Sequence, residues 1–86
     1  MLINLYTIKD LKTKAFGKIF MFQNDEIAAR QFHVALITDD TMSQFPDDYV
    51  LYAIGVYDDD SGVITANSPE RMLTGPEALN KLTKEN

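Results

Sequence analysis

The run from Tyr49 to Tyr57 constrains the fold more than any other stretch of the sequence. Apart from Gly55, every residue in it is apolar or aromatic, and branched and aromatic side chains favour a β-strand. A polar turn from Asp58 to Gly62 follows, and Val63 begins a return strand. Since Asp, Ser and Gly supply the backbone geometry of tight turns, the stretch predicts a β-hairpin.

Both faces of the strand are apolar, because residues of either parity lack charged side chains. A sheet with one wet face alternates apolar and polar residues, so we predict a central strand covered on both sides, with Leu51 and Ile54 in the core. One helix rarely covers two faces, which leaves one face for a second copy of the chain; the alternative is that the tyrosine hydroxyls reach solvent. We therefore expect a homo-oligomer, with a dimer favoured. The candidate self-association residues are Tyr49, Leu51, Tyr52 and Tyr57.

The segments before this hairpin predict two strands and one helix. Residues 1–8 and 16–22 have the apolar pattern of a first hairpin, with Gly17 as a bulge or a point of close approach. Asn24 or Asp25 begins a helix that ends near residues 38–40. A loop is expected over 39–48. The stripe of the helix that should face the sheet consists of Ile27, Ala28, Phe32, Ala35 and Leu36.

Two helix starts are predicted after the second hairpin. The pair Ser68–Pro69 combines a cap residue with a proline at the first helical position. Thr74 and Glu77 fit a capping box for a last short helix, with Leu79 and Leu82 as its anchors.

These elements predict an α+β fold, a small β-β-α-β-β domain. We expect a four-stranded, mostly antiparallel sheet with one main helix and a short C-terminal helical appendage. The 86 residues should form a single domain, 1–86, with a core over about 1–75 and the appendage at 76–86. The absence of cysteine excludes disulfides and thiolate metal sites. No apolar run approaches the roughly 18 residues that span a bilayer, so we expect no membrane contact and a cytoplasmic location.

Charge is distributed unevenly along the chain. The formal net charge is −5, and no lysine or arginine occurs between Arg30 and Arg71, a span that holds eight acidic residues. This pattern argues against a broad basic footprint for nucleic acid.

Residues with catalytic or metal-binding chemistry are sparse. His33 is the only histidine, and neither a cysteine nor a diagnostic serine motif accompanies it as a nucleophile. The triplet Asp58 to Asp60 does not have the spacing of a calcium loop, so a solvated acidic turn is favoured. We predict a protein that is not an enzyme and that uses no cofactor and no metal.

One alternating pattern suggests contact with DNA. Lysine interleaved with aromatic residues at one parity is typical of single-strand binding, in which charge meets phosphates and bases stack on rings. A turn within 9–15 would break this shared face, so we favour lysines in a loop and phenylalanines in the core. The pattern comprises Lys12, Lys14, Phe16, Lys18, Phe20 and Phe22. The candidate DNA or partner contacts are Lys12, Lys14, Phe16 and Lys18.

The sequence also resembles a known viral family. Asp48-Tyr49-x-Leu51-Tyr52-x-Ile54-Gly55-x-Tyr57-Asp58, followed by Ser61-Gly62, is similar to the signature of the small nonstructural protein of gokushoviruses, single-stranded DNA phages of the microvirus family. Phe16-Gly17-x-Ile19-Phe20, Asn24-Asp25 with Ala28-x-Arg30-x-Phe32, and Ser68-Pro69 with Leu73 are similar in order and spacing. The family usually has proline after the first of these glycines, and Lys18 departs from that pattern.

The resemblance implies a protein of the host bacterial cytoplasm that is absent from the virion. It implies a role in viral DNA replication, at the switch to single-stranded genome synthesis, through protein–protein contacts with phage or host replication proteins. The alternative is a weak, sequence-independent single-stranded DNA-binding protein that uses the Lys9–Phe22 region.

Overall fold

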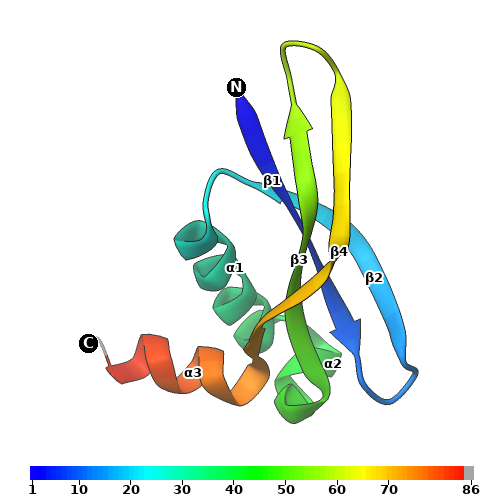
Figure 1. Ribbon diagram of the computed structural model, residues 1–86. Helices are drawn as coiled ribbons and strands as arrows, with labels where there is room; N and C mark the ends of the chain where they lie inside the picture. The colour runs from blue at the N-terminus through cyan, green and yellow to red at the C-terminus, as the bar shows by residue number, and fades with distance from the viewer. Residues whose placement is uncertain (85–86) are drawn as a thin grey trace.

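The computed structural model describes residues 1–84, and the chain folds into one antiparallel sheet with helices on one side (Figure 1). The strand order is β2-β1-β3-β4, which confirms the predicted α+β domain. The elements in chain order are β1 (Leu2–Asp10), β2 (Ala15–Phe22), α1 (Asp25–Thr38), α2 (Asp40–Gln44), the 3-10 turn η1 (Pro46–Asp48), β3 (Tyr49–Asp58), β4 (Val63–Thr74) and α3 (Gly75–Lys84).

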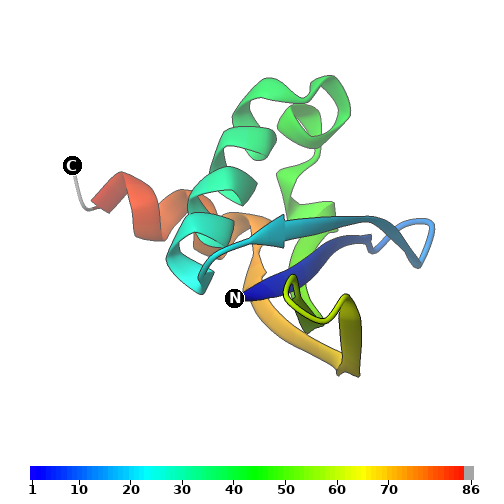
Figure 2. The ribbon, with the colours of Figure 1, turned by 90° about the horizontal axis from the view of Figure 1, so that it is seen from above.

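Strand β3 is central, as predicted, because β1 and β4 pair with its two edges. Leu51 is 1% exposed and packs with Tyr6 and Phe32 in the core. Buried Met42 of α2 and Ala78 of α3 belong to the same core. In Figure 2, α1 and α2 lie above the strands and no helix lies on the opposite side. The helices therefore cover only one face of the sheet.

Helix α1 begins where the sequence predicts. The side-chain oxygen of Asn24 accepts a hydrogen bond from the backbone N–H of Ile27 (2.9 Å), which satisfies one free donor of the first turn. Ala28, Phe32 and Leu36, spaced four residues apart, are buried. The other two members of the predicted stripe, at positions 27 and 35, are half-buried at its margins.

The segment 39–48 was expected to be a loop, and that prediction is wrong. It contains α2 and η1. One carboxylate oxygen of Asp39 accepts hydrogen bonds from the backbone N–H groups of Thr41 (3.0 Å) and Met42 (2.9 Å). This cap starts a new helix directly after α1, and burial of Met42 anchors it to the core.

Ser68–Pro69 does not begin a helix, contrary to prediction, because β4 continues through it. In the β3–β4 ladder Ala53 pairs with Glu70 and Gly55 with Ala66. Residues 67–69 have no partner in this ladder, so the missing N–H of proline breaks no bond there. Proline is tolerated in an edge strand for this reason.

The capping box at the start of α3 is confirmed. The backbone N–H of Thr74 donates to the Glu77 carboxylate (2.9 Å), and the backbone N–H of Glu77 donates to the Thr74 hydroxyl (3.1 Å). Leu79 packs against the core, and Ala78, which the sequence analysis did not single out, is fully buried. Leu82, the other predicted anchor, lies outside the described side chains.

A bulge at Ile54 changes the two-faced pattern of β3. Ile54 has no partner in either ladder, and it is half-exposed rather than in the core as predicted. On the N-terminal side of the bulge Leu51 faces the helices. Beyond it Tyr57 pairs with Ile3, whose neighbours of the same parity in β1 point away from the helices. The bulge therefore sends Leu51 and Tyr57 to opposite faces.

Candidate functional site

The face of the sheet that the helices leave uncovered is called the open face. Paired residues of adjacent strands point to the same side, so the register assigns its members. No described helix of residues 1–84 covers it (Figures 1 and 2). Its side chains come from all four strands: Ile3, Leu5, Thr7, Lys9, Phe16, Ile19, Met21, Val50, Tyr52, Tyr57, Ile64, Ala66, Arg71 and Thr74.

Aromatic rings pack together at the centre of the open face. The rings of Phe16 in β2 and Tyr52 in β3 meet edge to face, with centroids 5.2 Å apart. The strand between them, β1, carries Thr7, which is only 3% exposed although no helix covers it. The Thr7 hydroxyl donates to the carbonyl of Gly17 (3.2 Å). The Lys9 ammonium lies 5.1 Å from the Phe16 centroid, a cation–π contact.

Around this centre the open face exposes large apolar side chains. Ile19 is 64% exposed, Met21 57% and Phe16 45%, all in β2. At the other edge Ile64 of β4 is also 64% exposed. Contiguous apolar surface of this kind marks interaction sites more often than it marks idle surface. The open face is therefore the first candidate site.

The predicted lysine and aromatic set is not brought to one face. Lys12 and Lys14 lie in the turn between β1 and β2, as the favoured alternative expected. Lys14 has a φ of 63°, and the backbone N–H of Lys12 donates to the Asp10 carboxylate (2.9 Å). The turn thus separates these two lysines from the strand positions that follow.

A second irregularity divides the rest of the set. Thr7 pairs with Ile19 and Lys9 with Phe16, so Gly17 and Lys18 together stand opposite a single residue of β1. This is the bulge predicted at Gly17. It leaves Phe16 on the open face, Lys18 exposed in the bulge, and the phenylalanines at 20 and 22 on the helix side.

Carboxylates lie close to the hairpin lysines. The backbone N–H of Leu11 donates to the carbonyl of Asp48 (2.8 Å), which ties the turn to η1. Burial raises the pKa of the Tyr49 phenol, and the charges of Asp10, Asp39 and Asp48 raise it further. This end of the sheet is therefore of mixed charge, which opposes the approach of phosphates.

The four candidate self-association residues divide between the two faces. Leu51 lies in the core and Tyr49 packs against it, so neither presents its side chain on a free sheet surface. Tyr52 and Tyr57 are half-buried on the open face. Ordinary alternation along the strand separates Tyr52 from Leu51. The bulge at Ile54, which the residue pattern does not reveal, moves Tyr57 to the open face as well.

The acidic turn after β3 lies at the opposite end of that strand from Asp47 and Asp48, as expected (Figure 1). Carboxylate oxygens of Asp58, Asp59 and Asp60 lie within 4.8 Å of one another. The Met1 amine contacts the last two at 2.8 and 2.9 Å. A backbone N–H donated by Asp60 lowers the pKa of Asp58. His33, the other residue considered, is half-buried on α1.

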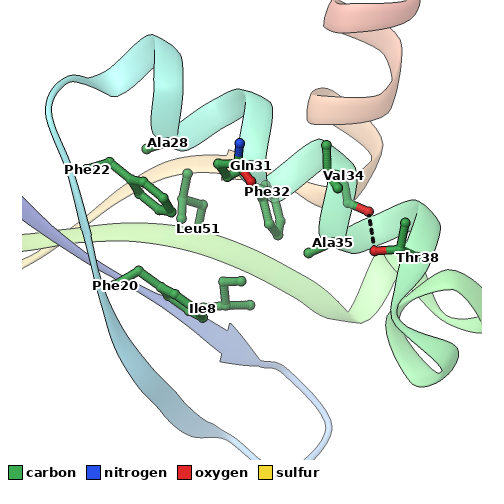
Figure 3. Close-up of a pocket in the computed structure, with 10 residues that line it drawn as sticks. All are labelled: Ile8, Phe20, Phe22, Ala28, Gln31, Phe32, Val34, Ala35, Thr38 and Leu51. Atoms are coloured by element: carbon green, nitrogen blue, oxygen red, sulfur yellow. Dashed lines mark hydrogen bonds between the residues drawn. The ribbon is translucent and has the colours of Figure 1, made fainter.

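A groove between α1 and β2 was not predicted from the sequence (Figure 3). It has a volume of about 290 Å³ and an apolar lining that includes Phe20, Phe22 and Val34. The two phenylalanine rings are nearly parallel, with centroids 6.2 Å apart. Val34 is 42% exposed, and its position off the predicted helix stripe was the one available signal. This space is called the β2 groove.

A buried polar contact joins β1 to α1. The Tyr6 hydroxyl donates to the Asp25 carboxylate (2.7 Å) and accepts from the Asn4 amide (3.2 Å). Burial, and then the bond to Asp25, raise the pKa of Tyr6 to about 12. The phenol therefore stays protonated, and the contact holds the helix on the sheet rather than supplying an acid or base.

Comparison with known protein families decides the affiliation of the chain. Residues 3–78 match the phage ORF5 protein family, a span that contains α1 and, apart from Leu2, all four strands. The chain belongs to the phage ORF5 protein family. It matches no curated protein and no solved structure.

The phage ORF5 family affiliation confirms the broader part of the resemblance, a phage protein. Membership of the gokushovirus group stays a prediction. Among its described residues no helix is long and apolar enough to cross a membrane.

Proposed function

We propose that this ORF5 family protein acts in viral DNA replication and promotes the switch to single-stranded genome synthesis. It does so by binding a phage or host replication protein, in the cytoplasm of the infected bacterium and not as a part of the virion. The observation that carries the proposal is the uncovered apolar open face, on which Ile19, Met21 and Ile64 are largely exposed.

The chemistry of the open face favours a protein partner. Lys9 and Arg71 are the two charged side chains among the positions that the register assigns to this face. The Lys9 ammonium already lies over the Phe16 ring, and the Arg71 guanidinium is paired with the Glu77 carboxylate at 2.8 Å. Burying apolar surface drives protein association, whereas DNA backbone binding depends on many lysine and arginine contacts with phosphates. The net charge of −5 also favours a protein partner over DNA. The proposed role needs no catalytic residue, cofactor or metal.

The second candidate, weak binding of single-stranded DNA, has one observation in its favour. The rings of Phe16 and Tyr52 meet on the open face with Lys9 above the first. The hairpin that carries Phe16 also holds Lys12, Lys14 and Lys18. Stacking on such rings and charge on such lysines are the two components of single-strand binding.

A phage carrying Ile64→Arg tests the protein-partner proposal. This side chain is exposed, so the substitution should leave the fold intact while placing a charge in the apolar face. We expect several-fold less single-stranded viral DNA relative to duplex, and loss of the replication protein from nuclease-treated pull-downs. Ile37→Arg, at a position on α1 that is 57% exposed, is the matched control and should change neither. An unchanged DNA ratio with Ile64→Arg would contradict the proposal.

Fluorescence anisotropy with a labelled single strand separates the two candidates. The protein-partner proposal expects no binding at low salt. The DNA alternative expects weak binding with a log–log salt slope near −3, from about four lysine–phosphate contacts. Changing Lys12, Lys14 and Lys18 together to glutamate should then abolish it.

A further inference from the structure

Strand β2 is an edge strand whose only protection is the bulge that contains Gly17 and Lys18. Within the described residues 1–84 it pairs with β1 on one side only, so no described strand occupies the N–H and C=O groups of its other side, which can accept a further strand. Lys18 is its one charged residue. Its open-face side chains Ile19 and Met21 are more than half exposed, and Phe20 and Phe22 are only partly covered on the other face. A strand that is apolar on both faces and free along one edge is suited to β-sheet extension.

The β2 groove provides space for the side chains of a strand added beside β2. In Figure 3 the rings of Phe20 and Phe22 lie beneath α1, and Val34 projects from the helix at the margin of the same space. Gln31 and Thr38 also line it, so its helix wall carries no charge. An added strand beside β2 would place its helix-side residues against this wall and close the groove.

The exposed area of the chain is consistent with a missing subunit. Its solvent-accessible surface is 5725 Å², whereas a compact monomer of 9.7 kDa exposes about 5100 Å². The excess, about 600 Å² by this scaling, approaches the roughly 800 Å² that each partner buries in a standard interface.

We propose that the occupant of this edge is the β2 strand of a second copy, paired antiparallel about a two-fold axis. The two sheets then form one continuous sheet of eight strands, with the two α1 helices side by side above it. This interface does not rest on the proposed function, because it uses the edge of the sheet and leaves most of the open face free.

A register centred on Phe20 suits the side chains better than one centred on Lys18. With Phe20 opposite Phe20 of the second copy, Ile19 stands opposite Met21, so apolar residues meet on each face. Lys18 then stands opposite Phe22, whereas a register centred on Lys18 would set like charges directly opposite each other, which is destabilising. Self-complementarity of this kind is what a two-fold interface requires.

The other edge does not offer the same fit. Strand β4 contains Pro69 and leaves the β3 ladder between Ala66 and Glu70. It also follows the acidic turn Asp58 to Asp60, which would repel its own copy. We therefore place the interface at β2 alone.

A matched pair of substitutions tests the interface by sedimentation. Ile19 and Ile64 are both 64% exposed, both on the open face, and lie on opposite edge strands. The unchanged protein should sediment at twice 9.7 kDa, Ile19→Lys at half that mass, and Ile64→Lys as the unchanged protein. A monomeric unchanged protein, or a dimer that only Ile64→Lys dissociates, would overturn the proposal.

Oxidative cross-linking provides a second test that does not depend on dissociation. The chain contains no cysteine, so Phe20→Cys introduces a single thiol on the proposed axis, where paired Cβ atoms lie roughly 5 Å apart. It should form a disulfide-linked dimer, and Ile64→Cys should not. Cross-linking at residue 64 alone would locate the contact at β4 and refute the interface, while leaving the replication proposal to its own test.

Discussion

At one edge of the sheet, β4 runs for 12 residues, is exposed throughout its first nine, contains Pro69 and breaks register twice. At the other edge, β2 runs for 8 residues with only Lys18 charged. Proteins protect edge strands with proline, charge and bulges, because free backbone groups invite further pairing. Strand β2 has only the bulge at Gly17 and Lys18, so most of the protection lies on β4. The less protected of the two edges is therefore where we place the contact.

The largest expected effect comes from the strand that holds both edges in place. Leu51→Ala should lower the free energy of unfolding by about 2–5 kcal/mol, the usual cost of truncating a buried aliphatic side chain. Since β1 and β4 both pair with β3, hydrogen exchange should accelerate at both edges together. Ile54→Ala, at the half-exposed bulge, should cost less. A loss below about 1 kcal/mol for Leu51→Ala, measured by urea unfolding, would show that β3 is not the common support.

High pH should loosen the β2 side first. The pKa of Tyr6 is about 12, above the roughly 10 of a free phenol, so the folded chain holds this proton more tightly than the unfolded chain. The resulting stability is present below pH 10 and is lost between about 10 and 12, by about 2–3 kcal/mol.

Tyr6→Phe should remove most of that pH dependence, with a remainder from Tyr49, whose pKa is also raised. The Tyr6 ring lies 5.8 Å from that of Phe22 in β2, so amide exchange should rise in β2 before β4. Equal pH dependence in Tyr6→Phe and the unchanged protein would assign the effect to other groups.

Gly55→Ala should loosen the opposite edge. A Cβ at residue 55 would overlap the carbonyl oxygen of Thr65, so β4 must shift. Overpacking of this kind costs about 1–3 kcal/mol. Gly17→Ala is the control on the β2 side, since its Cβ would lie 3.3 Å from the Ile8 carbonyl oxygen and needs only a small adjustment. Amide exchange should therefore increase in β4 with the first variant and much less in β2 with the second.

Particular positions show how much of the fold can be predicted from the sequence alone. The strands, α1 and the Thr74–Glu77 capping box follow from local patterns, because periodicity and caps act within a few residues. The bulge at Ile54 and the passage of β4 through Ser68–Pro69 depend on pairing with distant residues. A local pattern therefore assigns Ser68–Pro69 to a helix start, although the segment lies in an edge strand.

The same reasoning applies to the candidate site. Exposure of Ile19 and Met21 depends on β2 being an edge strand, which only the strand order reveals. The acidic surroundings of the hairpin lysines arise because η1 packs beside the turn through the Leu11–Asp48 bond. Sequence spacing reveals neither of these contacts. Self-association, which the two-faced apolar strand led us to expect, stays a prediction.

The variant with the smallest expected effect on stability, Pro69→Thr, tests the comparison of the two edges most directly. In the Ile19→Lys background, where the β2 interface should be lost, Pro69→Thr restores a backbone N–H to β4. Because residue 69 is exposed and outside the ladder, unfolding should change by no more than about 0.5 kcal/mol. If proline protects this edge, the double variant should gain mass with concentration in sedimentation, while Ile19→Lys alone stays at 9.7 kDa. A double variant that remains monomeric would assign the protection of β4 to its acidic turn and its break in register instead.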